Sequence, residues 1–208
     1  MSARRRFNSL RRKVETKAPK PKIVLYAEGE KTERDYFAAM KRAFHSKIVD
    51  IEIIEGAGVP LTIARRAAQA ASEARRQNRH QSYARRDEFW AVFDRDEHPN
   101  IPETMTLCKS AGVGVAFSDP CFELWLILHF EEFDRPDHRH DVQRHFETLC
   151  TDYDHAKRKT TDCNKLMELV LAAEQRAETQ LQRRKDEGDP PSCPFTTVYE
   201  LTRRIRTR

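Results

Sequence analysis

The stretch W-A-V-F-D-R-D-E-H, residues 90–98, begins as a buried strand and then delivers three carboxylates and an imidazole. Four apolar residues lead directly into Asp94, Asp96 and Glu97 with no turn residue between them. Crowded carboxylates repel one another and resist losing their water, so such a cluster needs a compensating partner. The pattern therefore predicts a core strand that ends in a cation-binding loop.

Apolar strands and amphipathic helices alternate on both sides of this stretch. We predict strands at 23–27, 49–54, 89–93 and 112–117. Helices are predicted at about 32–44, 61–76 and 102–109 from apolar residues at helical spacing. Strands that alternate with helices through short connections favour parallel βαβ units. The fold class is therefore α/β, with a mostly parallel sheet that carries helices on both faces.

After Ser118 the pattern becomes helical. Residues 119–130, D-P-C-F-E-L-W-L-I-L-H-F, are apolar nearly all round and predict a deeply buried helix, with Asp119 as its cap and Pro120 at its first position. Mainly polar helices are predicted at about 138–150, 163–186 and 195–206. We divide the chain into a basic flexible arm (1–21), an α/β core (22–133) and a helical C-terminal extension packed on the core (134–208).

Basic residues concentrate at the two ends of the chain. Residues 1–22 hold nine Lys or Arg against one Glu, and the last six residues include Arg203, Arg204, Arg206 and Arg208. Such segments favour contact with the phosphates of a nucleic acid, while a merely solubilising terminus has the same composition. Both interpretations of the arm remain open.

Cysteine usage and hydropathy exclude several classes of protein. The five cysteines lie far apart without a C-x-x-C pair, which suits neither a disulfide framework nor a thiolate zinc site. The longest apolar run, 124–128, is far shorter than a membrane span, and no apolar stretch follows the basic N-terminus. We therefore expect a cytoplasmic protein that does not enter a membrane.

Two strand ends of the predicted sheet are acidic. The first strand leads into A-E-G-E-K-T-E, with Glu28 and Glu33, and the third leads into Asp94 and Asp96. Residues two apart in an extended segment project to one side, and right-handed crossovers bring the first and third strands close. Ligands of open parallel sheets gather at this edge. Carboxylate oxygens suit Mg²⁺ or Mn²⁺, so Glu28, Asp94 and Asp96 are the predicted metal ligands.

Four further residues are candidates, each with a structural alternative. Lys31 could contact a scissile phosphate or merely neutralise nearby acids. His98 could exchange protons beside a metal-bound water, a role that histidine side chains often have in enzymes, or be an ordinary loop residue. Glu123 lies at the start of the most apolar helix, where it either faces solvent or belongs to the metal site. His129 in that helix is expected to be a hydrogen-bonded core histidine.

Three segments together resemble the RloB-like proteins, a family that also includes AbiLii of an abortive-infection system. These segments are I-V-L-Y-A-E-G-E-K-T-E-R-D-Y-F, W-A-V-F-D-R-D-E-H-P and S-D-P-C-F-E-L-W-L-I-L-H-F. The resemblance implies a Toprim-like (Rossmannoid) fold in which Glu28, Asp94 and Asp96 bind Mg²⁺. It also implies a function for Glu123, which falls in the family pattern S-x-P-C-F-E-x-W. Glu33 matches the related E-G-x-T-E signature with one additional residue between the two acids.

The resemblance further implies an ATPase partner of the AAA or ABC type in phage-defence loci. The chain has no phosphate-binding G-x-x-x-x-G-K-[ST] loop of its own. The resulting hypothesis is a Mg²⁺-dependent, Toprim-type nuclease that cleaves DNA or RNA as the effector of a defence system. Its alternative is a non-catalytic subunit that binds nucleic acid or the ATPase and carries a structural metal site. The sequence leaves open whether copies of the chain form a homo-oligomer.

For the nuclease hypothesis, the roles divide between metal binding and auxiliary catalysis. The metal ligands are Glu28, Asp94 and Asp96, while the auxiliary residues are Glu33, Glu123, Lys31 and His98.

Overall fold

A five-stranded sheet of order β2-β1-β3-β4-β5 is the central feature of the chain. The computed structural model describes residues 21–27, 31–44, 50–54, 59–78, 87–95, 98–153, 162–188 and 190–207. The strands are β1 (Lys22–Ala27), β2 (Asp50–Ile54), β3 (Glu88–Asp94), β4 (Gly114–Asp119) and β5 (Phe195–Thr196). The first four run parallel, and β5 pairs antiparallel with β4. The prediction of a mostly parallel α/β sheet is confirmed.

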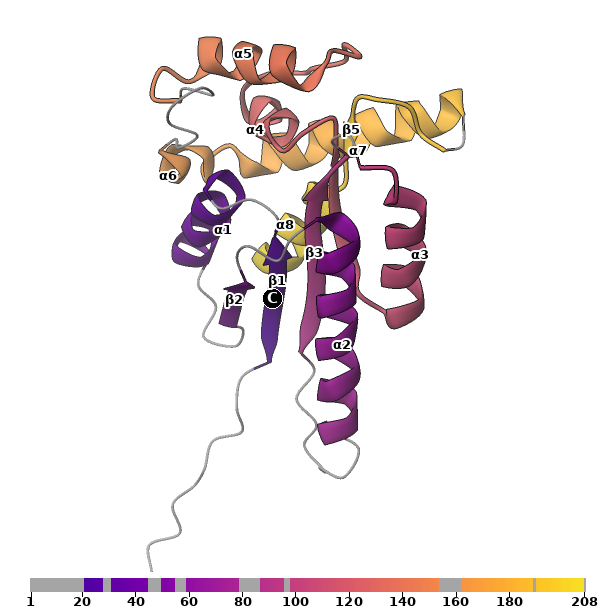
Figure 1. Cartoon of the computed structure of the whole chain (residues 1–208). Helices are drawn as coiled ribbons and strands as arrows, with labels where there is room; N and C mark the ends of the chain where they lie inside the picture. Colours follow the sequence, from indigo (N-terminus) through magenta and orange to yellow (C-terminus); the bar gives the residue numbers. More distant parts are fainter. Residues whose placement is uncertain are drawn as a thin grey trace, which may run out of the picture.

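Helices lie on both faces of this sheet. The connections between parallel strands hold α1 (Thr32–Ala43), α2 (Pro60–Asn78) and α3 (Ile101–Ala111). The helical C-terminal region holds α4 (Glu123–Phe130), α5 (Arg139–Leu149), α6 (Cys163–Leu166), α7 (Val170–Glu187) and α8 (Val198–Arg206). α2 packs on β1, β3 and α3, and Figure 1 shows α2 in front of the sheet and α8 behind it. No described helix is both long and apolar enough to cross a membrane.

The start of α4 differs from the sequence prediction. Asp119 is the last residue of β4, its peptide bond to Pro120 is cis, and α4 begins only at Glu123. Asp119 cannot cap the helix because it pairs with β5 and its carboxylate contacts Arg95. A carboxylate from another strand binds there instead, since the backbone N–H of Phe122 donates to Asp94 Oδ2 at 3.0 Å.

Two further boundaries also differ from prediction. The segment predicted as one helix over 195–206 begins with β5, because Thr196 and Thr197 hydrogen-bond to the edge of β4 and leave only 198–206 helical. The segment predicted as one helix over 163–186 is divided into α6 and α7. Tight turns at 167–169, in which Met167 and Leu169 donate to carbonyls three residues back, separate the two helices.

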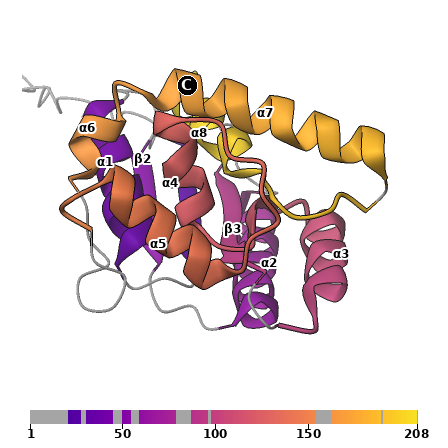
Figure 2. The same ribbon diagram turned by 90° about the horizontal axis from the view of Figure 1, so that it is seen from above.

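The helix α4 lies at the centre of the C-terminal core. Every residue from Glu123 to His129 is buried, which confirms the prediction from its uniformly apolar surface. In Figure 2 it lies between α5 and α7, and both helices pack on it. The ring of Tyr36 in α1 contacts Phe122 and Trp125 edge-on. The helical C-terminal region is thereby packed against the N-terminal half of the chain.

A buried histidine joins α1 to α4. His129 is 1% exposed, and its two ring nitrogens contact the hydroxyl of Tyr36 at 3.1 Å and the carbonyl of Trp125 at 3.0 Å. Burial, reinforced by the positive charge of Arg176, lowers the pKa of His129 to about 4. The side chain is therefore neutral at physiological pH, as expected for a core histidine.

The C-terminal arginines are ion-paired within the chain. Glu174 in α7 is 2% exposed and accepts two hydrogen bonds from Arg206, at 3.0 and 2.7 Å, and one from Thr202. Arg203 binds Glu178 through two hydrogen bonds, and Arg204 binds Glu88 in the same way. These three side chains fasten α8 to α7 and to β3. The charges of these three arginines are matched by carboxylates, whereas Arg208 lies outside the described residues.

The buried histidine predicts acid sensitivity. As the pH falls from 6.5 towards 4, the unfolded chain takes up a proton at His129 that the folded chain does not. This difference removes about 3 kcal/mol from the free energy of unfolding. The variant His129→Gln has no titrating group at this position, so its free energy of unfolding does not undergo this decrease. The difference in free energy of unfolding between wild type and variant is therefore about 3 kcal/mol smaller at pH 4 than at pH 6.5. Urea titrations at the two pH values measure it. An unchanged gap would contradict the assignment.

The ion pairs of Glu174 and Glu178 with arginines of α8 supply a second prediction. Glu174→Ala leaves the half-buried guanidinium of Arg206 without its partner and lowers the free energy of unfolding by about 3 kcal/mol. Glu178→Ala is the matched control, because its ion pair with Arg203 is exposed and contributes about 1 kcal/mol or less. Equal losses in the two variants, measured by urea denaturation, would show that burial does not distinguish these pairs.

Candidate functional site

The acidic edge of the sheet is formed where β1 and β3 end side by side. The two strands are paired in parallel, with Ala27 opposite Val92. The predicted proximity of the first and third strands is therefore confirmed. Glu28 follows Ala27 directly in the sequence, but both Glu28 and Asp96 lie outside the described residues. Asp94 is the proposed metal ligand that the structure places at this edge.

Asp94 is the last residue of β3 and is half-buried. Its Oδ2 accepts the hydrogen bond from Phe122 that satisfies the start of α4. The positive end of a helix dipole attracts a carboxylate, so the hydrogen bond from Phe122 holds Asp94 in a defined orientation. A carboxylate accepts about four hydrogen bonds or metal contacts in all. The bond to the backbone amide of Phe122 takes up one of these positions.

Arg95 fixes the segment after β3 to the end of β4. Its backbone N–H donates to Ser118 O at 2.9 Å, and its guanidinium donates to Asp119 Oδ2 at 2.5 Å. Asp119 is 2% exposed, so this arginine supplies the partner that a buried carboxylate requires. Sequence reasoning missed this pair because it assigned Asp119 to a helix cap. The signal that could have revealed it is an aspartate at the end of a buried strand.

Glu123 is the first residue of α4, next to Phe122, whose backbone N–H binds Asp94. It is 4% exposed, and the hydroxyl of Tyr153 donates to its Oε1 at 2.5 Å. Burial, followed by the charges of Glu123 and Asp94, raises the pKa of the Cys121 thiol well above its usual range. Glu123 and Asp94 both lie near the Cys121 thiol. Glu123 does not face solvent, and Tyr153 is a partner that sequence reasoning missed.

The remaining candidates lie at the starts of other elements. Lys31 is exposed and immediately precedes α1, whereas Glu33 is 8% exposed in the first turn of that helix. His98 is half-buried, and its backbone N–H donates to Arg95 O at 3.3 Å. Within the part of the chain that the structure describes, no three His, Cys, Asp or Glu side chains converge as a metal site. The functional roles of these residues stay predictions.

Comparison with known families decides the relationship of the chain. The model of the RloB-like protein family matches residues 23–205. The chain belongs to the RloB-like family. In this RloB-like protein the matched range begins in β1 and ends in α8, so it includes both the sheet and the helical C-terminal region. No match was found among curated proteins or among solved structures.

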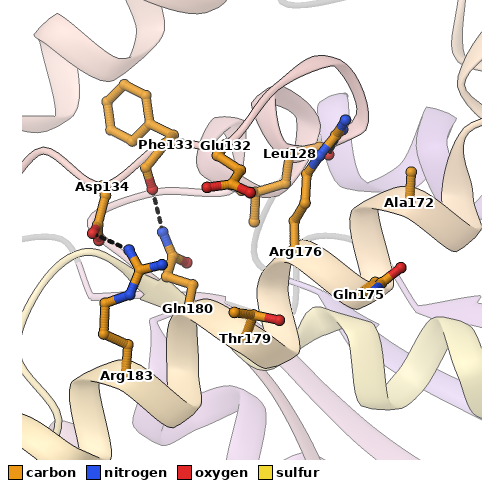
Figure 3. A pocket seen from close by; sticks show the side chains of 10 residues that line it. All are labelled: Leu128, Glu132, Phe133, Asp134, Ala172, Gln175, Arg176, Thr179, Gln180 and Arg183. Carbon is orange, nitrogen blue, oxygen red and sulfur yellow. Dashed lines mark hydrogen bonds and ion pairs between the residues drawn. The ribbon is translucent and has the colours of Figure 1, made fainter.

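A pocket of about 290 Å³ lies away from the acidic edge, between α7 and the segment that follows α4 (Figure 3). Gln180 donates to the carbonyl of Phe133 there, and Arg183 pairs with Asp134. The side-chain oxygen of Gln180 is buried and has no partner among the described residues. Asp94 and Glu123 do not line this pocket. The proposed chemistry of this RloB-like protein therefore does not involve it.

The contact between Tyr153 and Glu123 generates a prediction for the site. Tyr153→Phe removes a hydrogen bond to a buried carboxylate and lowers the free energy of unfolding by about 2 kcal/mol. In a Glu123→Gln background the same change costs about 1 kcal/mol or less, because the acceptor is no longer charged. Urea denaturation of the four proteins measures this coupling, and additive losses would show that the two side chains do not interact.

Proposed function

We propose that this RloB-like protein is a metal-dependent nuclease that hydrolyses the phosphodiester bonds of DNA or RNA. The observation that carries the proposal is the parallel pairing of β1 with β3, with Asp94 at the end of β3. Glu28 follows β1 in the sequence, and Asp96 is two residues beyond Asp94. In this proposal these three carboxylates hold one Mg²⁺ or Mn²⁺ ion at the edge of the sheet.

The chemistry of the donor set fits a hard divalent cation. Carboxylates from two adjacent strand ends provide the oxygen ligands that Mg²⁺ prefers in proteins. The amide of Phe122 and the helix behind it orient Asp94, which reduces the cost of arranging a ligand set. When bound, such an ion activates water and offsets the negative charge that develops on a phosphoryl group.

The protein's own residues would assist at this edge. Lys31 is exposed and could bind a phosphate oxygen of the substrate as a point charge. His98 lies three residues beyond Arg95 and would exchange a proton with the attacking water or the leaving oxygen. Glu33 and Glu123 are buried acids, and their proposed part is to orient neighbouring groups. Tyr153 would hold Glu123 in place through its hydroxyl.

The biological setting that we propose follows from the family alone. The resemblance that names the RloB-like proteins also associates them with phage defence and with AAA or ABC ATPases. We therefore propose that this protein is the cytoplasmic effector of such a system, and that the ATPase activity resides in a separate chain. The lack of a phosphate-binding loop in the sequence supports that division of labour.

One observation favours a second candidate function. The hydrogen bond from Phe122 gives Asp94 a structural task at the start of α4, whether or not a metal binds. A non-catalytic subunit that binds nucleic acid or the ATPase could keep an acid at this position for folding alone. Cleavage assays separate the two functions, because the subunit binds nucleic acid without cutting it.

The substitution Asp94→Asn tests the nuclease. Asparagine keeps an oxygen that accepts the bond from Phe122 but removes the negative charge, so the fold persists while metal-dependent cleavage falls by at least about 100-fold. Labelled DNA and RNA are incubated with Mg²⁺, Mn²⁺ or EDTA, and folding is checked by circular dichroism. Asp152→Asn is the control, because Asp152 is exposed in a turn after α5.

Three outcomes separate the candidates. Cleavage that EDTA abolishes and that only Asp94→Asn reduces supports the nuclease. Normal cleavage by folded Asp94→Asn overturns the proposed metal site. Binding of nucleic acid by the wild-type protein without cleavage under any metal condition favours the non-catalytic subunit.

A further inference from the structure

The solvent-exposed face of α2 carries an excess of positive charge. Arg65, Arg66, Arg75 and Arg76 are all exposed. Arg65 and Arg76 lie on one side of the helix because they are eleven residues apart, and we call these two the α2 arginine face. Glu73 is the sole acidic residue of the helix, and its carboxylate accepts a hydrogen bond from Gln69. We propose that the α2 arginine face docks the phosphate backbone of double-helical nucleic acid. The inference rests on the proposed function for the identity of the substrate.

The other long helices do not offer a comparable surface. α7 has four basic and four acidic residues, α5 has two of each apart from histidines, and α3 has one of each. α1 has three basic and two acidic residues, which is an excess of one positive charge. α8 has three arginines and one glutamate, but carboxylates of α7 and β3 bind all three arginines. Among the described helices, α2 thus has the largest excess of basic over acidic residues.

The partners of Arg65 and Arg75 leave the positive charge of these two side chains in place. Arg65 lies 3.9 Å from Glu103, but both side chains are more than 60% exposed, so water and salt screen this contact. Arg75 donates to the carbonyl of Ala111, which is a neutral acceptor. Arg76 has no ion-pair or hydrogen-bond partner within the described part of the chain. A phosphate would therefore meet cations that the protein has not already neutralised.

The spacing of these side chains fits an extended polyanion. Arg65 and Arg76 are eleven residues apart, which is three helical turns, so they lie on one line about 16 Å long. Gln69 and Ser72 lie on the same line and are polar groups that can also bind phosphate oxygens. The apolar residues Ile63, Ala64, Ala67 and Ala71 face the sheet. A line of this length corresponds to about five base pairs along a duplex.

The composition of the face favours a double helix over a single strand. Proteins that bind single strands stack the bases on aromatic side chains, and α2 contains no aromatic residue. Arginine, glutamine and serine side chains suit contacts with the sugar-phosphate backbone, which in a duplex is the outermost part. The face therefore matches the outside of a duplex rather than unstacked bases.

The placement of α2 links the face to the acidic edge. All four parallel strands end at that edge, and α2 begins at Pro60, six residues after the end of β2. The helix then runs back along the sheet beside β3 (Figure 1). Arg65 and Arg66 consequently lie in its second turn, towards the end of the sheet where Asp94 lies. A duplex held along α2 would be directed towards the proposed metal ligands.

Removal of charge from α2 tests the docking surface. The full chain, its Arg65→Gln/Arg76→Gln variant and a control variant are titrated with labelled DNA and RNA duplexes in EDTA at several salt concentrations. A plot of log affinity against log salt concentration has a negative slope, and each lost phosphate contact reduces the magnitude of this slope by about 0.9. The α2 variant is therefore expected to bind about tenfold more weakly, with a slope reduced by about 2.

The control variant Arg144→Gln/Lys165→Gln removes the same number of exposed positive charges from α5 and α6. It reproduces the change in net charge, and the N-terminal arm is identical in all three proteins. A loss confined to the α2 variant supports the surface. Equal losses in the two variants show that net charge alone governs binding and overturn it, as does unchanged binding by the α2 variant.

Further outcomes separate this inference from the nuclease proposal. Tighter binding of a single-stranded oligonucleotide than of either duplex, with the same dependence on α2, overturns the duplex as the occupant. Duplex binding that depends on α2 without any metal-dependent cleavage leaves the docking surface standing and overturns the nuclease alone. Failure to bind any nucleic acid overturns both proposals.

Discussion

The parallel pairing of β1 with β3 is the constraint on which the acidic edge depends. Because Ala27 lies opposite Val92, the two strands leave the sheet at the same place, and the acids that follow each strand start from adjacent positions. A sheet that separated these strands by another strand would set their ends about 10 Å apart. The pairing of β3 with β4, in which Asp94 lies opposite Ser118, lets the amide of Phe122 bind Asp94, so the start of α4 is built onto the end of β3.

Around this edge, buried charges are matched by partners from distant parts of the chain. Asp119 binds Arg95, Glu123 binds Tyr153, and Glu174 binds Arg206 and Thr202. Each contact joins two parts of the chain, so Glu123, a catalytic candidate from the sequence, also helps to hold the fold together. Residues at the start of α4 thus contribute to the fold and also belong to the proposed site. Substitutions that remove the charge but keep the shape, such as Asp94→Asn, are needed to separate the two roles.

The arginines of α8 and those of α2 have different surroundings. The arginines of α8 are bound to carboxylates and act as fasteners, whereas those of α2 face solvent on a helix that runs beside β3. In the proposed function, an acidic edge and a basic helix on one sheet would suit a polyanionic substrate. Repulsion between its phosphates and the carboxylates would then be offset by a cation at the edge and by arginines that hold the flanking backbone.

The sequence by itself determined the α/β sheet, the neighbouring first and third strands and the family, together with a buried helix that ends at residue 130 but whose start it placed at 119 and not at 123. These features follow from local apolar periodicity and from the handedness of βαβ connections, which are properties of short segments. Only the tertiary structure decided that Arg95 binds Asp119, that Tyr153 binds Glu123 and that Arg204 binds Glu88. These partners are separated by 24, 30 and 116 residues. No local pattern specifies such pairs, because the packed chain brings them together.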